Sequence, residues 1–216
     1  MKALQTATLL AATLTTGLMA GLFAAFTYSV MPGLGRSSDH AMIETMQNIN
    51  KAIVNPFFML LFMGSLPLLA LAAFLAWRGH GRPALPWIFA ALALYLIAFF
   101  VTSGVNVPLN DKLARAGDPR HIKDLAAVRS EFENAWVTWN AVRALLHTAA
   151  FGCLVWALVV YGAHRLPETG KAGPAAYDTS GPAPAGPYQR PSAQRPAAPS
   201  GAPLPWVPPT GRRTTD

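Results

Sequence analysis

Four long stretches of the chain contain no charged residue. They lie between Lys2 and Arg36, between Lys51 and Arg78, between Arg82 and Asp111, and between Arg143 and Arg165. An apolar stretch of about 18 residues or more is typical of a helix that crosses a membrane. The pattern therefore predicts an all-α membrane four-helix bundle, with spans at about residues 7–30, 55–77, 85–105 and 136–161.

The first apolar stretch has a second interpretation, as a cleaved signal peptide with an apolar core of about 7–15 residues. The run continues well past the small residues Ala20 and Gly21, which favours an uncleaved helix. Gly17 and Gly21 also form a small-xxx-small pair, a spacing that lets a neighbouring helix approach closely. The Met-Pro-Gly sequence at residues 31–33 is expected to end this helix.

Residues 39–54 have the pattern of an amphipathic helix. Polar residues such as Glu44 and Gln47 separate apolar ones, which are Met42, Ile43, Met46, Ile49 and Ile53. We expect this helix to lie at the membrane interface or to pack over the bundle. Asn55 and Pro56 then start the second span, because Asn is a good N-cap and Pro fits the first helical position.

Two further segments complete the organisation. Residues 111–134 are polar and compatible with a helix, whose expected start is at Asp118 and Pro119. Residues 165–216 are rich in Pro, Ala and Gly, bury too little apolar surface to fold, and are predicted to form a disordered tail. The expected domains are a membrane domain at residues 1–164 and this tail.

Composition narrows the class of protein. Only 12% of the residues are charged, against about 25% in soluble domains, which excludes a soluble globular protein. The net charge of +7 is not gathered into a dense basic patch with aromatic residues, so nucleic acid is not an expected partner. Cys153 is the single cysteine, which excludes a disulfide scaffold.

Charge also predicts the orientation. Four spans place both termini on one side, which holds Lys2, Arg78, Arg82 and the basic tail residues. On the other side, the basic residues of segment 111–134 are balanced by acidic ones. The positive-inside rule then predicts cytoplasmic termini in a bacterial plasma membrane.

Polar residues near the bilayer gather on the fourth span. Trp136, Asn140, Arg143 and His147 are spaced by 4, 3 and 4 residues and share one helix face, with Trp139 beside them. By alternation of the spans, Asn55 and Asn106 belong to the same end of the bundle. A charged residue inside a membrane span usually faces the bundle interior or a watered cavity.

Simpler explanations stay open for each of these residues. The Arg143 side chain could extend to the lipid headgroups. Trp136 and Trp139 could form part of an interfacial aromatic belt. His147 could be an interior histidine bonded to a carbonyl, while Asn106 and Asn110 could cap helix ends around Pro108.

Several segments together resemble a family of small four-helix membrane proteins that includes the anthrone oxygenases. The more specific ones are Asn106-Val107-Pro108-Leu109-Asn110 and Trp136-x-x-Trp139-Asn140-x-x-Arg143. Weaker ones are Met31-Pro32-Gly33-Leu34, Met46-Gln47-x-x-Asn50 and Asn55-Pro56-Phe57-Phe58. The resemblance spans about residues 17–160 and implies oxidation of an anthrone to an anthraquinone by O₂ without a cofactor.

Under this scheme, His147, neutral beside Arg143, would remove the acidic ring proton, and Arg143, Asn140 and Asn106 would stabilise the enolate oxygen. Trp136 and Trp139 would hold the polycyclic ring. The expected catalytic residues are thus Arg143, His147 and Asn140. The expected substrate-binding residues are Asn106, Asn110, Trp136, Trp139, Asn50 and Asn55.

No metal is expected, because the five histidines are scattered and no metal-ligand spacing occurs. The expected partners are membrane lipid, a hydrophobic aromatic small molecule and O₂. Two other functions stay open. The polar cluster could bind a ligand or stabilise the bundle without catalysis, or the protein could be a transporter, although four spans are few and no inverted repeat is visible.

Overall fold

A computed structural model describes residues 2–79 and 81–164 of the chain. The chain divides into two units, residues 1–171 and 172–216, and the described residues all lie in the first. The predicted disordered tail, residues 165–216, lies outside the described residues.

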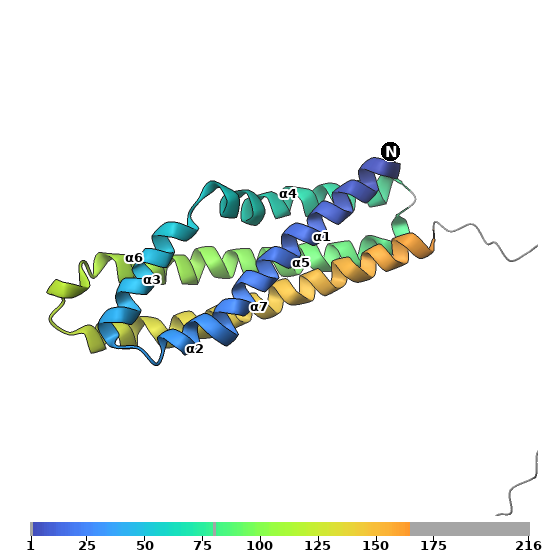
Figure 1. The fold of residues 1–216 in the computed structure, drawn as a ribbon. Helices are drawn as coiled ribbons and strands as arrows, with labels where there is room; N and C mark the ends of the chain where they lie inside the picture. The colour runs from blue at the N-terminus through green and yellow to red at the C-terminus, as the bar shows by residue number, and fades with distance from the viewer. Residues whose placement is uncertain (1, 80, 165–216) are drawn as a thin grey trace, which may run out of the picture. The chain divides into compact units, whose positions relative to one another are not determined.

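The described part of the chain is helical and contains no strand (Figure 1). The elements are α1 (Lys2–Ala25), η1 (Phe26–Val30), α2 (Met31–Leu34), α3 (Asp39–Ile53), α4 (Pro56–Arg78), η2 (Arg82–Ala84), α5 (Leu85–Val101), η3 (Thr102–Asn106), α6 (Val107–Arg115), η4 (Pro119–His121) and α7 (Leu125–Ala163). Of the η segments, η1 and η3 are π-helical turns and the other two are 3₁₀ turns.

Four helical segments are long and apolar enough to cross a membrane, as the charge pattern predicts. They are Lys2–Leu34, Pro56–Arg78, Arg82–Arg115 and Leu125–Ala163. Their outward faces carry exposed large apolar side chains, among them Leu14, Leu60, Phe100 and Leu145. Apolar side chains exposed on every long helix are stable in contact with lipid and unfavourable in contact with water. The protein is therefore a membrane four-helix bundle.

Asn55 and Pro56 start α4 as predicted. The Asn55 Oδ1 atom accepts a hydrogen bond from the Phe58 amide at 3.0 Å, and Pro56 occupies the first helical position. The amphipathic segment forms α3, where the Ser38 hydroxyl accepts a hydrogen bond from the Ala41 amide at 3.3 Å. This helix packs across α6 and α7, so it covers the bundle (Figure 1).

The first helix continues beyond the Met-Pro-Gly sequence that was expected to end it, and it ends at Leu34. The π turn η1 comes directly before this sequence, and the π turn η3 likewise precedes Pro108 by two residues. Proline has no N–H and crowds the carbonyl four residues earlier, and a widened turn relieves both problems. Each of these two helices therefore forms a wider π turn before its proline and continues beyond it.

Asp118 and Pro119 begin only a short turn, η4, and the long helix α7 begins later, at Leu125. The Asp118 carboxylate caps η4 by accepting from the Arg120 amide at 3.0 Å. Hydrogen bonds from Arg120 hold the pKa of this carboxyl well below its usual range. The cap of α7 is Asp124, which accepts from the Ala127 amide.

The buried apolar residues form two cores. The larger lies among α1, α4, α5 and α7 and includes Leu9, Phe23, Leu69, Tyr95 and Leu154. The second lies at the end of the bundle where α3 and α6 pack on α7, and it consists of Met31, Met42, Ile43, Met46, Leu113, Phe132 and Trp136. The polar stripe of α7 crosses the boundary between these cores.

Candidate functional site

A cavity of about 300 Å³ opens where the two cores meet. It lies among α1, α3, η3, α6 and α7, and its walls are mainly apolar. The predicted site residues that line it are Asn50, Asn110, Trp136, Asn140 and Arg143. Pockets for small ligands have volumes of about 300–1,000 Å³ and mainly apolar walls with a few polar groups, so this cavity is of ligand-binding size.

Arg143 lies at the inner end of this cavity and is only 5% exposed. Its guanidinium stacks over the Phe23 ring at 4.4 Å and lies 5.5 Å from the Trp136 ring centroid. Its Nη2 atom donates to the Asn140 Oδ1 atom at 2.8 Å, while its Nε is buried without a hydrogen-bond acceptor in the described chain. Arg143 therefore faces the bundle interior and does not extend to the headgroups.

No carboxylate in residues 2–79 and 81–164 forms an ion pair with Arg143. The ion pairs of His40, Asp118, Arg129 and Lys112 lie elsewhere in the fold. A buried cation usually has a paired anion, because desolvation of a charge is costly. The guanidinium thus presents unused donors to a cavity of low polarity, which favours binding of an anionic oxygen.

Asn140 positions Arg143. Its Nδ2 atom donates to the Phe23 carbonyl at 3.0 Å and to the Thr27 hydroxyl at 2.9 Å, and both of these acceptors belong to the first helix and the π turn after it. The two contacts direct the Asn140 Oδ1 atom toward Arg143. The amide therefore has its main hydrogen bonds inside the protein, and it orients the cation.

Two further contacts join η3 and α6 to α7 beside the cavity. The Trp136 Nε1 atom donates to the Asn110 Oδ1 atom at 2.8 Å. The fully buried Asn106 donates from Nδ2 to the Trp136 carbonyl at 3.3 Å, and its Oδ1 atom has no partner among the described residues. Asn106 does not line the cavity but lies behind Trp136.

His147 lies one helical turn deeper than Arg143 and is fully buried. Its ring packs against Phe23 and Tyr95, with a centroid separation of 4.8 Å in each case. The Nδ1 atom lies 2.8 Å from the Arg143 carbonyl, which can only accept, so Nδ1 donates and Nε2 carries the lone pair of the neutral ring. His147 does not line the cavity, and the described chain offers its Nε2 no partner.

Besides Asn106, two predicted binding residues do not line the cavity. Trp139 is 39% exposed on the outer side of α7. Asn55 is exposed, and its side chain is engaged as the cap of α4 and as a donor to the Ala52 carbonyl. Asn50, in contrast, lines the cavity, and its buried Nδ2 atom has no partner in residues 2–79 and 81–164.

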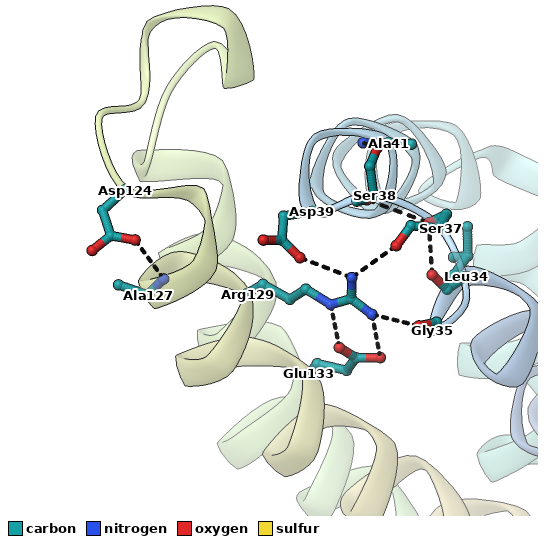
Figure 2. A network of polar contacts seen from close by, with 10 residues as sticks. All are labelled: Leu34, Gly35, Ser37, Ser38, Asp39, Ala41, Asp124, Ala127, Arg129 and Glu133. Atoms are coloured by element: carbon teal, nitrogen blue, oxygen red, sulfur yellow. Dashed lines mark hydrogen bonds and ion pairs between the residues drawn. The ribbon is translucent and has the colours of Figure 1, made fainter.

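Arg129 joins α7 to the chain segment that leads into α3 (Figure 2). It forms ion pairs with Glu133 at 2.5 Å and with Asp39 at 2.9 Å. It also donates to the carbonyls of Gly35 and Ser37 at 2.8 and 3.0 Å. We call these contacts the Arg129 clamp, and they hold the N-terminal end of α3 against α7.

Gln47 holds the middle of α3. It occupies the polar side of the predicted amphipathic pattern, but its Nε2 atom donates to the carbonyls of Leu113 and Gly117, both at 2.9 Å. Sequence reasoning missed this contact, as it missed the roles of Phe23 and Thr27. The spacing of Arg129 and Glu133 by four residues predicts their ion pair on one helix face, but it does not predict the contacts of Arg129 with Asp39, Gly35 and Ser37.

Comparison with known proteins supports the family resemblance. A family model described as anthrone oxygenase matches residues 58–153. Residues 58–153 carry the pattern of the anthrone oxygenase family. The match includes the Asn106–Asn110 segment and the stripe of α7, and it confirms the predicted resemblance. The search of curated proteins and the search of solved structures find no match.

The segment that matches the family model supplies one part of the cavity, and residues before it supply the rest. Phe58, Asn110 and Arg143 lie inside the matched residues, whereas Phe23 and Asn50 lie outside them. No group of three or more His, Cys, Asp and Glu residues in residues 2–79 and 81–164 could hold a metal ion. Besides the exposed Lys51 and Asp111, the cavity is lined by Arg143, amide side chains, Thr102 and apolar or aromatic residues.

Proposed function

We propose that this membrane protein oxidises a lipophilic polycyclic compound of the anthrone type with O₂. The observation that carries the proposal is Arg143, a buried guanidinium with no carboxylate partner in the described chain, at the inner end of an apolar cavity. Such a cation stabilises an enolate oxygen, which is the charge that develops when an anthrone loses its ring proton. The family match over residues 58–153 supports the same substrate class.

The proposed reaction needs no reagent besides O₂. Loss of a proton from the methylene carbon of the anthrone gives an enolate, and its carbon then forms a bond to O₂. The resulting hydroperoxide loses water to form the second carbonyl group. One oxygen atom enters the anthraquinone and the other leaves as water, so anthrone and O₂ give anthraquinone and water.

The residues have distinct roles in this proposal. Arg143 binds the enolate oxygen, and Asn140 and Thr27 position it. Trp136 and Phe23 supply flat faces for the ring system. His147 is the base, through the lone pair of Nε2, and it reaches a ligand only if the Phe23 ring rotates away.

The direct test is oxygen uptake by the purified protein in lipid vesicles supplied with anthrone. We expect substrate-dependent uptake with the native chain and a loss of about 100-fold or more with Arg143→Ala, the usual cost of removing an oxyanion donor. Arg120→Ala is the matched control, because Arg120 is exposed and pairs only with Asp118. Absence of uptake above the spontaneous rate across several anthrones would refute the proposed oxidation.

The placement of His147 favours a second candidate, a protein that binds such a ligand without oxidising it. His147 is fully buried and lies outside the cavity, so it contacts a ligand only after the side chains around it move. His147→Gln separates the two functions. If the protein oxidises anthrone, His147→Gln should still bind anthrone but lose oxygen uptake. If the protein only binds anthrone, neither the native chain nor any variant should show substrate-dependent uptake.

A bacterial plasma membrane with cytoplasmic termini is the location that we propose. The start of α1, the end of α7 and the turn between α4 and α5 lie at one end of the bundle (Figure 1). Among the described residues, that end carries Lys2, Arg78 and Arg82 without an acidic residue, while the α3 and α6 end carries both signs. The positive-inside rule favours the first end as cytoplasmic.

A further inference from the structure

An apolar groove of about 400 Å³ lies beside the Arg143 cavity, among α1, α3 and α4. Leu18 and Met19 line it from α1, and Phe57 and Leu61 line it from α4. Leu18 and Phe57 are more than half exposed and lie on helices that are apolar enough to cross a membrane. The groove therefore opens toward lipid.

The groove and the Arg143 cavity share a wall. Leu22, Ile49, Ile53 and Phe58 line both of them. The wall is made of apolar side chains that carry no hydrogen bond of their own, so side-chain rotation alone could open it. Since α1, α3 and α4 each contribute to it, a shift of one helix would widen the opening.

The contacts of α3 indicate which of these helices is free to shift. Its N-terminal end is held by the Arg129 clamp, and its middle is held by Gln47. Beyond Gln47, no side chain of α3 hydrogen-bonds another helix in the described chain, and the one contact there is from Asn55, the cap of α4, to the Ala52 carbonyl. This free end carries Ile49 and Ile53. The ends of an element that lack long-range contacts open at the lowest free energy.

From these observations we infer that the ligand of the Arg143 cavity enters from the bilayer, through the groove between α1 and α4, past the free end of α3. The ligand class is an apolar compound with one oxygen that can carry negative charge. The apolar part of the ligand would contact the groove and the shared wall. Its oxygen would accept hydrogen bonds from the Arg143 guanidinium, which has no carboxylate partner in the described chain. The inference rests on the proposed function only for the choice of an anthrone as probe.

The alternative route leads from water. Lys51, Asp111 and Ala114 also line the cavity and are exposed, so a ligand from water would pass them. Ala52 lines only the groove and Ala114 lines only the cavity, and both are exposed alanines. Replacing each with tryptophan therefore obstructs one route at a time with the same side chain.

The first experiment measures anthrone binding under nitrogen, by quenching of tryptophan fluorescence in lipid vesicles. We expect Ala52→Trp to slow association and dissociation about tenfold each and to leave Kd within about twofold, because an obstruction on a route affects both rates. Ala114→Trp takes space in the cavity itself and should raise Kd, but it should not slow association. Unchanged rates in Ala52→Trp, slower rates in Ala114→Trp instead, or no binding by the native chain would each overturn the inference.

The second experiment needs no ligand. A nitroxide label at Ala52→Cys, in a Cys153→Ala background, is tested for collision with O₂, which concentrates in lipid, and with a water-soluble nickel chelate. We expect high O₂ and low nickel accessibility, and the reverse for a label at Glu44→Cys on the exposed polar side of α3. A label at residue 52 that collides mainly with nickel would overturn the inference.

The outcomes separate this inference from the proposed oxidation. Slowed anthrone binding in Ala52→Trp without any oxygen uptake would retain the route and refute the oxidation. Oxygen uptake by the native chain with unchanged binding rates in Ala52→Trp would retain the oxidation and refute the route.

Discussion

A single residue, Arg143, connects the fold to the proposed chemistry. Its burial against Phe23 and Trp136 leaves one hydrogen bond to Asn140 and no carboxylate partner in the described chain. Such an environment is costly for folding, because the charge loses water without gaining an anion. Sites that bind a developing charge commonly carry this cost, since the donors must already be in place when the charge appears.

Replacing Arg143 with Met tests this balance. The apolar side chain fills similar space without a charge, so we expect the midpoint of thermal unfolding in detergent to stay unchanged or to rise, while oxygen uptake is lost. Arg143→Lys is the comparison that keeps a charge. A clear fall in the unfolding midpoint of Arg143→Met would show that Arg143 mainly stabilises the bundle.

Thr27 is a positioning residue, since its hydroxyl accepts from Asn140 and donates to the Phe23 carbonyl. Thr27→Val removes one of the two acceptors that orient Asn140, a hydrogen bond worth about 1 kcal/mol. We expect kcat for anthrone oxidation to fall about fivefold with little change in KM. Thr15→Val is the control, because Thr15 bonds only the Ala12 carbonyl within its own helix; equal effects of the two variants would contradict the assignment.

At the scale of elements, α3 forms one wall of the cavity. Its apolar face packs into the second core through Met42, Ile43 and Met46. The side chains of α3 contact other elements at its start, where Asp39 joins the Arg129 clamp, and at its middle, where Gln47 bonds two carbonyls. The helix is thus anchored at one end and free at the end that lines the cavity.

Arg129→Met removes the Arg129 clamp and should release the anchored end of α3. We expect backbone amide exchange in residues 39–47 to become at least about tenfold faster, which corresponds to about 1.4 kcal/mol of local stability. Exchange measured by mass spectrometry checks this. Arg120→Met, which removes an exposed pair with Asp118, should leave exchange in α3 unchanged.

The contact between α1 and α7 depends on Gly17 rather than on the whole small-xxx-small pair. A Cβ at Gly17 would lie 2.8 Å from the Phe151 ring, whereas a Cβ at Gly21 would meet nothing within 4 Å. Gly17→Val should therefore destabilise the bundle by about 1–3 kcal/mol, the usual cost of overpacking. Gly21→Val, with the same change in helix propensity, should leave the unfolding midpoint unchanged.

At the scale of the membrane domain, the two cores place the polar residues at one end of the bundle. The larger core fills the region among the four long helices, and the second core lies under α3. The cavity forms where they meet, since neither core fills that boundary completely. The site therefore depends on how several helices pack at this boundary, and no single helix forms it.

The proposed orientation is testable with reporter fusions in bacteria. Alkaline phosphatase, which is active only after export, should be inactive when fused after Ala163 and active when inserted at Gly117. Green fluorescent protein at the same positions should give the opposite pattern. Active phosphatase at Ala163 would show that the termini lie outside the cytoplasm.

The sequence by itself determined the membrane bundle, the start of α4 and the polar stripe of α7. These features depend on local properties, namely the length of charge-free runs, a good N-cap before proline and the spacing of residues on one helix. The same stripe correctly indicated that Arg143 shares a face with Trp136 and Asn140. The segments Asn106–Asn110 and Trp136–Arg143 added the resemblance to the anthrone oxygenases, whose family model matches residues 58–153.

Only the tertiary structure decided what those residues contact. Arg143 and His147 lie on one helix face, but Arg143 lines the cavity while His147 is enclosed by Phe23 and Tyr95. Gln47 has the sequence environment of a solvent-facing residue, yet it bonds α6 and the turn after it. Helical spacing specifies a direction from one axis, whereas burial and partners depend on which other helices pack there, and these lie far away in the sequence.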